Sequence, residues 1–275
     1  MEGKRVLITG GNSGIGLVTS RELAAQGAEV VLACRDTEKT ASALATINAT
    51  AKIPAVNLPV ELGNLASVRH LAETFLGKYD RLDVLINNAG LFPPKQRLTD
   101  DGFEMQFGVN HLSHFLLTNL LLDCLKASAP SRIISVSSML HKKGELALDA
   151  VRGYEKYSGQ VAYNNSKLCN VMFAVELAKR LAGTGVTSNV LHPGAVATDI
   201  VRDTPWLVRK IIGLIFISPD KGAQTTIMLA SDPALAEVTG KYYDQCKEDQ
   251  YSPLADDAAL RQQLWDLSAE LTGLS

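Results

Sequence analysis

A glycine-rich turn between an apolar run and a helical segment constrains the fold more than any other feature. Residues 6–9 have the length and composition of a buried strand, and residues 17–26 have helical spacing. The turn between them consists of Thr9, Gly10, Gly11, Asn12, Ser13, Gly14, Ile15 and Gly16. Glycines let a backbone turn tightly and approach a pyrophosphate, whose charge then meets free N–H groups at the helix start. Because such turns also occur for steric reasons alone, the loop favours nucleotide binding without establishing it.

Short apolar runs followed by helical spacing recur along the chain. The clearest runs are residues 6–9, 30–33, 84–86, 133–136 and 186–191. This βαβ rhythm predicts an α/β fold of the Rossmann type, a doubly wound parallel sheet with helices on both faces. No linker or internal repeat divides the 275 residues, so we expect a single domain over residues 1–275. The last strand is expected near residues 241–244, and a closing helix at residues 256–271.

The composition narrows the class of protein and its partners. Lys and Arg number 27 against 29 Asp and Glu, and no basic block is present, which argues against binding to nucleic acid. The widely spaced Cys34, Cys124, Cys169 and Cys246 form no CxxC pair, which suits a reducing compartment and favours a cytoplasmic location. We expect no targeting segment before the first strand, since residues 1–5 lead directly into it, and the longest apolar stretch, residues 211–217, is too short to span a membrane. Any membrane contact is therefore expected to be peripheral.

Six ordered motifs make the chain resemble the short-chain dehydrogenases/reductases. The glycines at 10, 14 and 16 have that family's TGxxxGxG spacing, and five further motifs follow in the family's order. They are NNAG at 87–90, VNHLSHF at 109–115, ISVSS at 134–138, YNNSK at 163–167 and LHPG at 191–194. Nearer likeness to the NADP-preferring retinol dehydrogenases comes from LACRD at 32–36, AYNNSKLCN at 162–170, GAQTT at 222–226 and LWDLS at 264–268. The resemblance covers essentially the whole chain and implies a nicotinamide-dependent oxidoreductase.

The end of the second predicted strand indicates which nicotinamide cofactor is used. An acidic residue there would bind a ribose 2′-hydroxyl, whereas the planar, permanently charged fork of Arg35 suits a 2′-phosphate and predicts NADP(H). The alternative is that Arg35 is solvated and Asp36 binds the hydroxyl. The resemblance places Asn12 and Ser13 at the same corner, and Glu61 and Leu62 at the adenine, although the family more often has Asp at position 61. It implies further contacts from Gly10, Gly14, Ile15, Gly16, Asn88, Ala89, Gly90, Tyr163, Lys167, Pro193, Val196 and Thr198.

A tyrosine and a lysine four residues apart suggest the chemistry. Helical spacing puts Tyr163 and Lys167 on one face, so the ammonium can lie near the phenol. A charge ~5 Å away at an effective dielectric of ~20 favours phenolate by roughly 3 kcal/mol, or about two pKa units. We therefore expect Lys167 to lower the pKa of Tyr163, which then exchanges a proton with the substrate oxygen while hydride moves to or from the nicotinamide.

The resemblance adds two residues and a second role for Lys167. It implies that Ser138, rather than Ser137, donates a hydrogen bond to the substrate oxygen, and that Lys167 also bonds to the nicotinamide ribose. Asn110 is implied to shape its helix and to hold a water that links Lys167 to solvent. Taken singly, each motif has an ordinary alternative, since a YxxxK pair can be surface decoration and a serine pair can be a helix cap. The ordered set favours catalysis.

Two histidines at helical spacing are candidate metal ligands. His111 and His114 can present two imidazoles on one helix face, but no nearby Cys, Asp or Glu completes a set. We therefore expect them to pack and to form hydrogen bonds, with no metal at the site.

Two segments are expected to form the substrate site, because substrate choice in this fold belongs to loops at the carboxyl ends of the strands. The 24 residues between Ser138 and Tyr163 predict a rim at residues 141–161. Residues 198–219 are rich in large apolar side chains, interrupted by Arg209 and Lys210, and are expected to form a mobile lid over a hydrophobic pocket. The same pattern leaves open that residues 205–217 lie on a membrane surface or pack as an ordinary helix.

The expected activity is NADP(H)-dependent interconversion of a hydrophobic alcohol and its aldehyde or ketone, with retinoids among the candidate substrates. One alternative is another reductase activity of the same superfamily, such as protochlorophyllide reduction. A second alternative is a non-catalytic nucleotide-binding scaffold. The resemblance also implies a homodimer formed through the helices that contain Asn110 and Tyr163, although those helices would be amphipathic in a monomer too.

Overall fold

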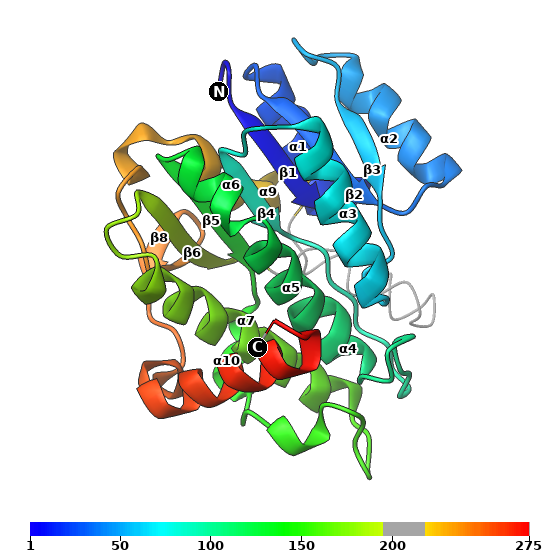
Figure 1. The fold of residues 1–275 in the computed structure, drawn as a ribbon, viewed down its shortest axis with the longest axis vertical. Coiled ribbons are helices and arrows are strands. Elements are labelled where there is room, and N and C mark those ends of the chain that lie inside the picture. The colour runs from blue at the N-terminus through cyan, green and yellow to red at the C-terminus, as the bar shows by residue number, and fades with distance from the viewer. Residues whose placement is uncertain (195–217, 275) are drawn as a thin grey trace.

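The computed structural model describes residues 1–194 and 218–274, and one central sheet runs through these two stretches (Figure 1). The spatial order is β3-β2-β1-β4-β5-β6-β7-β8, and every neighbouring pair is parallel except β7 with β8. The strands are β1 (Arg5–Thr9), β2 (Glu29–Cys34), β3 (Val56–Pro59), β4 (Val84–Asn87), β5 (Ser131–Val136), β6 (Val186–His192), β7 (Tyr242–Asp244) and β8 (Lys247–Asp249). The order reverses between β1 and β4, where such sheets bind ligands at the carboxyl ends of the strands.

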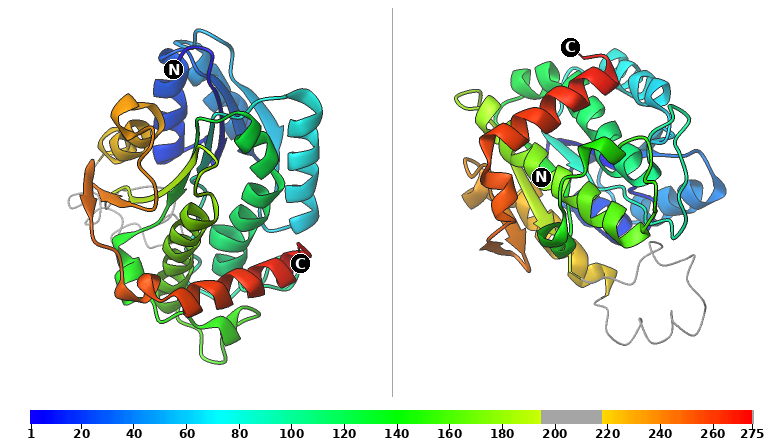
Figure 2. Two further views of the ribbon diagram at one scale, coloured as in Figure 1. Left: turned by 60° about the vertical axis from the view of Figure 1, so that its left-hand side comes forward. Right: turned by 90° about the horizontal axis from the view of Figure 1, so that it is seen from below.

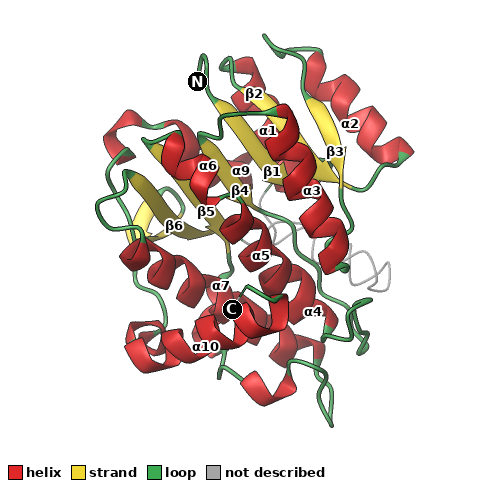
Figure 3. Cartoon of the chain, viewed as in Figure 1, coloured by secondary structure: helices red, strands yellow, loops and turns green. Residues whose placement is uncertain are grey.

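Helices cover both faces of the sheet (Figure 3). On one face lie α1 (Gly14–Ala25), α2 (Glu38–Asn48) and α9 (Pro219–Ser231); on the other lie α3 (Leu65–Lys78), α5 (Ser113–Leu120), α6 (Leu122–Ala127) and α7 (Gly159–Arg180). Successive side chains of β1 point to opposite faces of the sheet. Val6 and Ile8 pack in the core beneath α1 and α9, whereas Leu7 packs in the core beneath α3 and α5. All three side chains are fully buried. The predicted doubly wound α/β architecture is confirmed.

Two strands, β3 and β8, are not predicted by the sequence. The strand expected near residues 241–244 is present as β7, but it is not the last one, because β8 follows it. β3 is a short strand at the edge of the sheet with only Leu58 buried, so it has no continuous apolar run. β8 consists of exposed charged residues and pairs antiparallel with β7 because Gln245 and Cys246, at φ 47° and 61°, turn the chain back. Because the turn, rather than burial, sets the register of β8, the sequence of this strand has no hydrophobic pattern that would predict it.

The closing helix α10 (Ala258–Thr272) lies across α7 and α5 (Figure 2). Its Trp265 ring meets Phe115 of α5 at 5.0 Å and Phe173 of α7 at 5.9 Å between centroids. Its Arg261, 1% exposed, bonds to Glu176 of α7 at 3.1 Å. Of the 22 residues of α7, only those at its two ends are exposed. A homodimer through α5 and α7 would therefore require α10 to be displaced.

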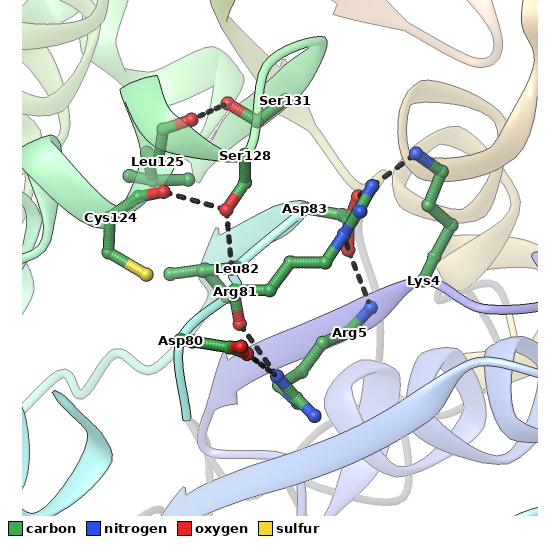
Figure 4. A network of polar contacts seen from close by, with 10 residues as sticks. All are labelled: Lys4, Arg5, Asp80, Arg81, Leu82, Asp83, Cys124, Leu125, Ser128 and Ser131. Carbon is green, nitrogen blue, oxygen red and sulfur yellow. Dashed lines mark hydrogen bonds and ion pairs between the residues drawn. The ribbon is translucent and has the colours of Figure 1, made fainter. Parts of the chain in front are cut away.

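The amino ends of the strands are held by a polar network on the edge opposite the carboxyl ends (Figure 4). Asp83, which precedes β4, is 2% exposed and accepts hydrogen bonds from Lys4 Nζ (2.9 Å), Arg5 N (2.9 Å) and Arg81 Nη2 (2.7 Å). Burial raises the pKa of Asp83, but the hydrogen bonds from Arg81, Arg5 and Lys4 outweigh burial and leave it below its ordinary value. Ser128 accepts from Leu82 N at 2.9 Å. This edge is structural and fixes β1 against β4.

Candidate active site

The glycine loop follows β1 as predicted, and its backbone is packed too closely for side chains. Gly10 and Gly14 have φ values of 65° and 50°. A Cβ on Gly16 would lie 2.3 Å from the Gly10 carbonyl oxygen and 2.6 Å from Asn88 Nδ2. Ile15, by contrast, turns its side chain into the core beside Val18 and Ala223, so any ligand contact from residue 15 uses its backbone. Glycine is thus required at position 16 for steric reasons.

The loop is fastened to the turn after β4. Asn88 Nδ2 donates to the Thr9 carbonyl at 2.8 Å, while the N–H groups of Asn88 and Ala89 donate to Thr9 Oγ1 at 2.9 and 3.0 Å. Gly90 continues this turn, and a Cβ on it would approach Lys167 Nζ to 3.3 Å and Asn110 Oδ1 to 3.5 Å. Residues 88–90 therefore link the glycine loop to the predicted catalytic residues.

The start of α1 suits a negatively charged group. Ser13 stands at the cap position but makes no side-chain capping bond, and no acidic side chain lies in the first turn. The cap and first-turn side chains of α1 itself thus leave the positive end of this helix unneutralised. Together with the cramped glycine at position 16, this arrangement fits the pyrophosphate of a dinucleotide cofactor.

The corner at the end of β2 brings together three residues expected to contact the adenosine end. Thr40 Oγ1 donates to the Arg35 carbonyl at 2.6 Å and receives Asn12 Nδ2 at 2.8 Å. The Arg35 side chain is 63% exposed, with Nη1 at 3.9 Å from Glu61 Oε2. Leu62 packs against the core and is only partly buried. Thr40, which joins Asn12 to Arg35, is not predicted from the sequence as a site residue. The sequence indicates a local role for it only through its place three residues after Thr37, the cap of α2.

The predicted catalytic side chains meet at the carboxyl end of β5. Ser138 follows that strand, and the first turns of α7 bring Tyr163 and Lys167 beneath it. Lys167 Nζ lies over the Tyr163 ring, 5.6 Å from its centroid, and donates to the Val136 carbonyl at 3.0 Å. The tyrosine and lysine are 7% and 2% exposed. The i, i+4 spacing thus brings the amine to the phenol ring, as expected.

The expected lowering of the Tyr163 pKa is wrong for the groups that the chain itself supplies. Burial raises the pKa of Tyr163 to about 12, although its hydrogen bond with Ser138 acts in the opposite direction. Burial also lowers the pKa of Lys167 to about 8. The cause is desolvation, which penalises both the phenolate of Tyr163 and the ammonium of Lys167. The ammonium does not offset this penalty, because it faces the ring and the Val136 carbonyl rather than the Tyr163 hydroxyl. Additional positive charge is needed before Tyr163 can release its proton near neutrality.

The two adjacent serines have different partners. Ser137 is buried, and its Oγ donates its hydrogen to the Lys167 carbonyl of α7 at 2.7 Å. That hydrogen is therefore not available to a substrate oxygen. Ser138 Oγ accepts from Leu140 N at 3.2 Å and forms the bond to Tyr163 that lowers the latter's pKa. This division supports the choice of Ser138 for contact with the substrate oxygen.

Asn110 lies in a π-helical turn, Gly108–Leu112, between α4 (Met105–Phe107) and α5. Its Oδ1 accepts from Leu91 N at 2.9 Å, and its Nδ2 donates to the Leu91 carbonyl at 3.1 Å and to Ser166 Oγ at 3.0 Å. The side chain is thereby fixed between the turn after β4 and helix α7. The irregular turn is of the kind that often marks a functional site, and it agrees with the helix-shaping role implied for Asn110.

Three apolar side chains, called here the apolar rim, adjoin the reactive residues either in the chain or in space, namely Met139, Val161 and Phe92. Met139 and Val161 are 53% and 41% exposed, and they neighbour Ser138 and Tyr163 in the chain. Phe92, which belongs to none of the sequence motifs, meets the Tyr163 ring edge to face at 5.0 Å. Residues 139–158 contain two 3₁₀ turns, Met139–Lys143 and Leu148–Ala150. Pro193 and Gly194 follow β6 at the same edge of the sheet.

Part of the predicted site lies outside the described residues. Val196, Thr198 and nearly all of the expected lid at residues 198–219 fall in the gap at 195–217, and only Ser218 and Pro219 are described, where they begin α9. The described histidines His111 and His114 are both buried and hydrogen-bonded, as expected. Across residues 1–194 and 218–274, no cluster of three or more His, Cys, Asp or Glu could hold a metal ion. In the same ranges, no helix is both long enough and apolar enough to cross a bilayer.

Comparison with known proteins gives a consistent result. A family model described as short chain dehydrogenase matches residues 4–205. The chain is 45% identical over 294 residues to retinol dehydrogenase 14 of Homo sapiens, covering 100% of this chain and 88% of the relative. A crystal structure of an uncharacterised protein from Mycobacterium paratuberculosis superposes with a TM-score of 0.80 at 35% identity, over 99% of this chain and 94% of the other. The RhlG/NADP active-site complex of Pseudomonas aeruginosa superposes with a TM-score of 0.73 at 26% identity, over 88% of this chain and 94% of the other.

Proposed function

The chain belongs to the short chain dehydrogenase family, and on that premise we propose that it interconverts a hydrophobic alcohol and its aldehyde or ketone with NADP(H). The observation that carries the proposal is the meeting of Ser138, Tyr163 and Lys167 beside a glycine loop that excludes any side chain at position 16. The name of the human relative supports an apolar alcohol as substrate. The NADP complex among the structural neighbours supports a nicotinamide cofactor.

The chain's own residues would divide the proton chemistry among them. When bound, the nicotinamide cofactor supplies or accepts the hydride, and its oxidised ring adds a positive charge. Ser138 Oγ donates to the substrate oxygen and orients it, while Tyr163 Oη accepts the hydroxyl proton during oxidation and returns one to the oxygen during reduction. The ammonium of Lys167 would bond to the ribose of the cofactor. Because burial outweighs the hydrogen bond with Ser138 and leaves the pKa of Tyr163 at about 12, the positive charge of the oxidised nicotinamide would be needed for the oxidation step.

The apolar rim supports a hydrophobic substrate. Met139 and Val161 are large exposed side chains one and two residues from Ser138 and Tyr163 in the chain, and Phe92 lies against the Tyr163 ring. A hydrocarbon chain attached to the reacting carbon would remove these side chains from water, with a gain of roughly 0.8 kcal/mol for each buried methylene. Aldehydes of lipids, including retinaldehyde, have the required chemistry.

A series of straight-chain aldehydes of increasing length tests this proposal. With NADPH, kcat/KM is expected to rise about fourfold for each added methylene until the rim is covered. Met139→Ser and Val161→Ser should flatten that rise, because they remove the apolar surface. Leu76→Ser is the matched control, since Leu76 is also exposed (46%) but lies at the far end of α3. Equal efficiency for short and long aldehydes in the unaltered protein would count against a hydrophobic substrate.

Arg35→Asp is expected to reverse the cofactor preference. Loss of the guanidinium removes charge-assisted bonds worth about 1.5–3 kcal/mol, and the new carboxylate repels a 2′-phosphate, so kcat/KM with NADPH should fall at least about 100-fold relative to NADH. Glu61→Gln is the companion variant. It removes the carboxylate that lies 3.9 Å from Arg35 and should raise the affinity for NADPH. Steady-state kinetics with both cofactors measure the outcome. A preference for NADH that Arg35→Asp leaves unchanged would favour Asp36 as the ribose-binding residue.

The alternatives differ in what they predict for the same assays. A non-catalytic scaffold would bind NADPH without oxidising it in the presence of any carbonyl, whereas a protochlorophyllide reductase would act on that pigment and not on aldehydes.

We further propose a cytoplasmic location. Peripheral membrane contact through residues 205–217 stays a prediction, because those residues lie outside the described part of the chain. A homodimer also stays a prediction, and the cover of α5 and α7 by α10 argues for a surface other than those helices.

A further inference from the structure

A buried histidine outside the reactive group joins the glycine loop to the helix of Asn110. His114 belongs to α5 and is 2% exposed. Its Nδ1 lies 3.1 Å from the Asn110 carbonyl oxygen, and its Nε2 lies 2.9 Å from Thr9 Oγ1. Thr9 is the last residue of β1, so the imidazole spans from the sheet to the π-helical turn.

The chemistry of its partners fixes where the imidazole carries its proton. A carbonyl oxygen can only accept, so Nδ1 must carry the hydrogen that is donated to Asn110. Burial lowers the pKa of His114 to about 4, so the ring is neutral near neutrality and Nε2 is an acceptor. The Thr9 hydroxyl therefore donates to Nε2. Its other neighbour, the Ile86 carbonyl, is at 3.5 Å, the longer and weaker contact.

The hydrogen bonds then run in one direction across the site. The N–H groups of Asn88 and Ala89 donate to Thr9 Oγ1, which donates to His114, which in turn donates to the Asn110 carbonyl. At one end of this chain lies the turn whose Asn88 packs against Gly16. At the other end lies Asn110, whose side chain holds Ser166 of α7, one residue before Lys167. Hydrogen bonds aligned head to tail in a buried site reinforce one another.

We propose that His114 is a positioning residue that holds the turn at residues 88–90 and the π-helical turn of Asn110 in fixed relation, and so sets the cofactor cradle against Lys167 and Tyr163. The inference rests on the proposed function for its consequence in turnover. Its consequence for cofactor binding is independent of any substrate. The ring touches neither the substrate nor the reacting atoms, so it acts through Thr9 and Asn110.

The test compares two buried histidines of the same segment. His114→Phe removes both bonds and is expected to lower kcat/KM and NADPH affinity by about tenfold or more. His111→Phe is the matched control. His111 is equally buried and loses a bond of similar length, 3.0 Å to Ser268 of α10, which belongs to neither the glycine loop nor the turn at residues 88–90. It should lower the melting temperature by a comparable amount while leaving NADPH affinity and kcat unchanged.

A conservative variant of His114 and a double variant with Thr9 distinguish a positioning role of His114 from a general effect on stability. His114→Gln offers a side-chain carbonyl to the Thr9 hydroxyl and should recover most of the lost NADPH affinity. Thr9→Ser should resemble the unaltered protein, while Thr9→Val should lower NADPH affinity at least as much as His114→Phe, because it also removes the acceptor of the Asn88 and Ala89 N–H groups. The double variant should be no worse than Thr9→Val alone, because His114 acts through the Thr9 hydroxyl. If His114→Phe does not fold, the contrast between Thr9→Val and Thr9→Ser carries the same comparison.

Fluorescence titration with NADPH keeps this inference distinct from the proposed function. A split between the His114 and His111 variants in NADPH affinity upholds the positioning role even if no aldehyde is reduced. Equal affinity for NADPH in both variants, or losses from Thr9→Val and His114→Phe that multiply in the double variant, would overturn it.

Discussion

Tyr163→Phe is expected to lower kcat by about a thousandfold while leaving the dissociation constant for NADPH within about twofold of its original value. The variant keeps the ring and its packing on Phe92 but removes the oxygen that exchanges the proton, and positioned acid–base groups contribute roughly 10²–10⁴ to rate. Single-turnover measurements of NADPH oxidation, together with cofactor titration, separate chemistry from binding.

Tyr157→Phe is the matched control for that experiment. Burial raises the pKa of Tyr157 to about 12, as it does for Tyr163. Its hydroxyl, however, donates to the Pro93 carbonyl at 3.1 Å and has no part in the reactive group. Its loss should change stability by about 1 kcal/mol and leave kcat nearly intact. Near-native turnover by Tyr163→Phe would contradict the mechanism.

Gly16→Ala is expected to weaken NADPH binding by at least about a hundredfold. A methyl group at this position would stand 2.3 Å from the Gly10 carbonyl oxygen, so the loop backbone must move away from the position that receives the pyrophosphate. Because a misplacement of about 1 Å can cost two orders of magnitude, the smallest side chain suffices for the effect. Isothermal titration with NADPH measures it directly.

Gly77→Ala is the matched control for the glycine loop. Gly77 lies in α3, and a Cβ there meets nothing within 4 Å. The added methyl group should leave NADPH affinity unchanged and should be neutral or stabilising by up to about 1 kcal/mol. If Gly16→Ala bound NADPH as tightly as this control, the fit of a dinucleotide to the glycine loop would have to be abandoned.

The sequence predicts the strands that are buried and misses those that are not. β1, β2, β4, β5 and β6 read as continuous apolar runs because helices cover both of their faces. β3 and β8 stand at the two edges of the sheet, where water replaces one neighbour and the apolar run is lost. The predicted closing helix is real, but it starts at Ala258 because the side chain of Asp257 caps it.

The sequence predicts that the side chains of the candidate site lie together, but it does not predict the pKa of Tyr163. Motif order locates Ser138, Tyr163 and Lys167, since the spacing of residues on one helix and one strand end is local information. The pKa of Tyr163 was predicted in the wrong direction because it depends on burial of the whole ring, to which distant residues contribute. Phe92 and His114 were missed as contributors for the same reason, because their partners lie on other elements.

The helix α10 has a consequence for how the protein is made. Every residue assigned to proton transfer is synthesised before Ala258, and so are the Phe115 and Phe173 rings on which Trp265 rests. Before α10 is synthesised, the two rings lack the cover of Trp265, and a nascent chain folded up to that point would carry an apolar surface of the kind that invites aggregation or chaperone binding. A complete set of reactive side chains thus precedes the segment that covers the rings beneath them.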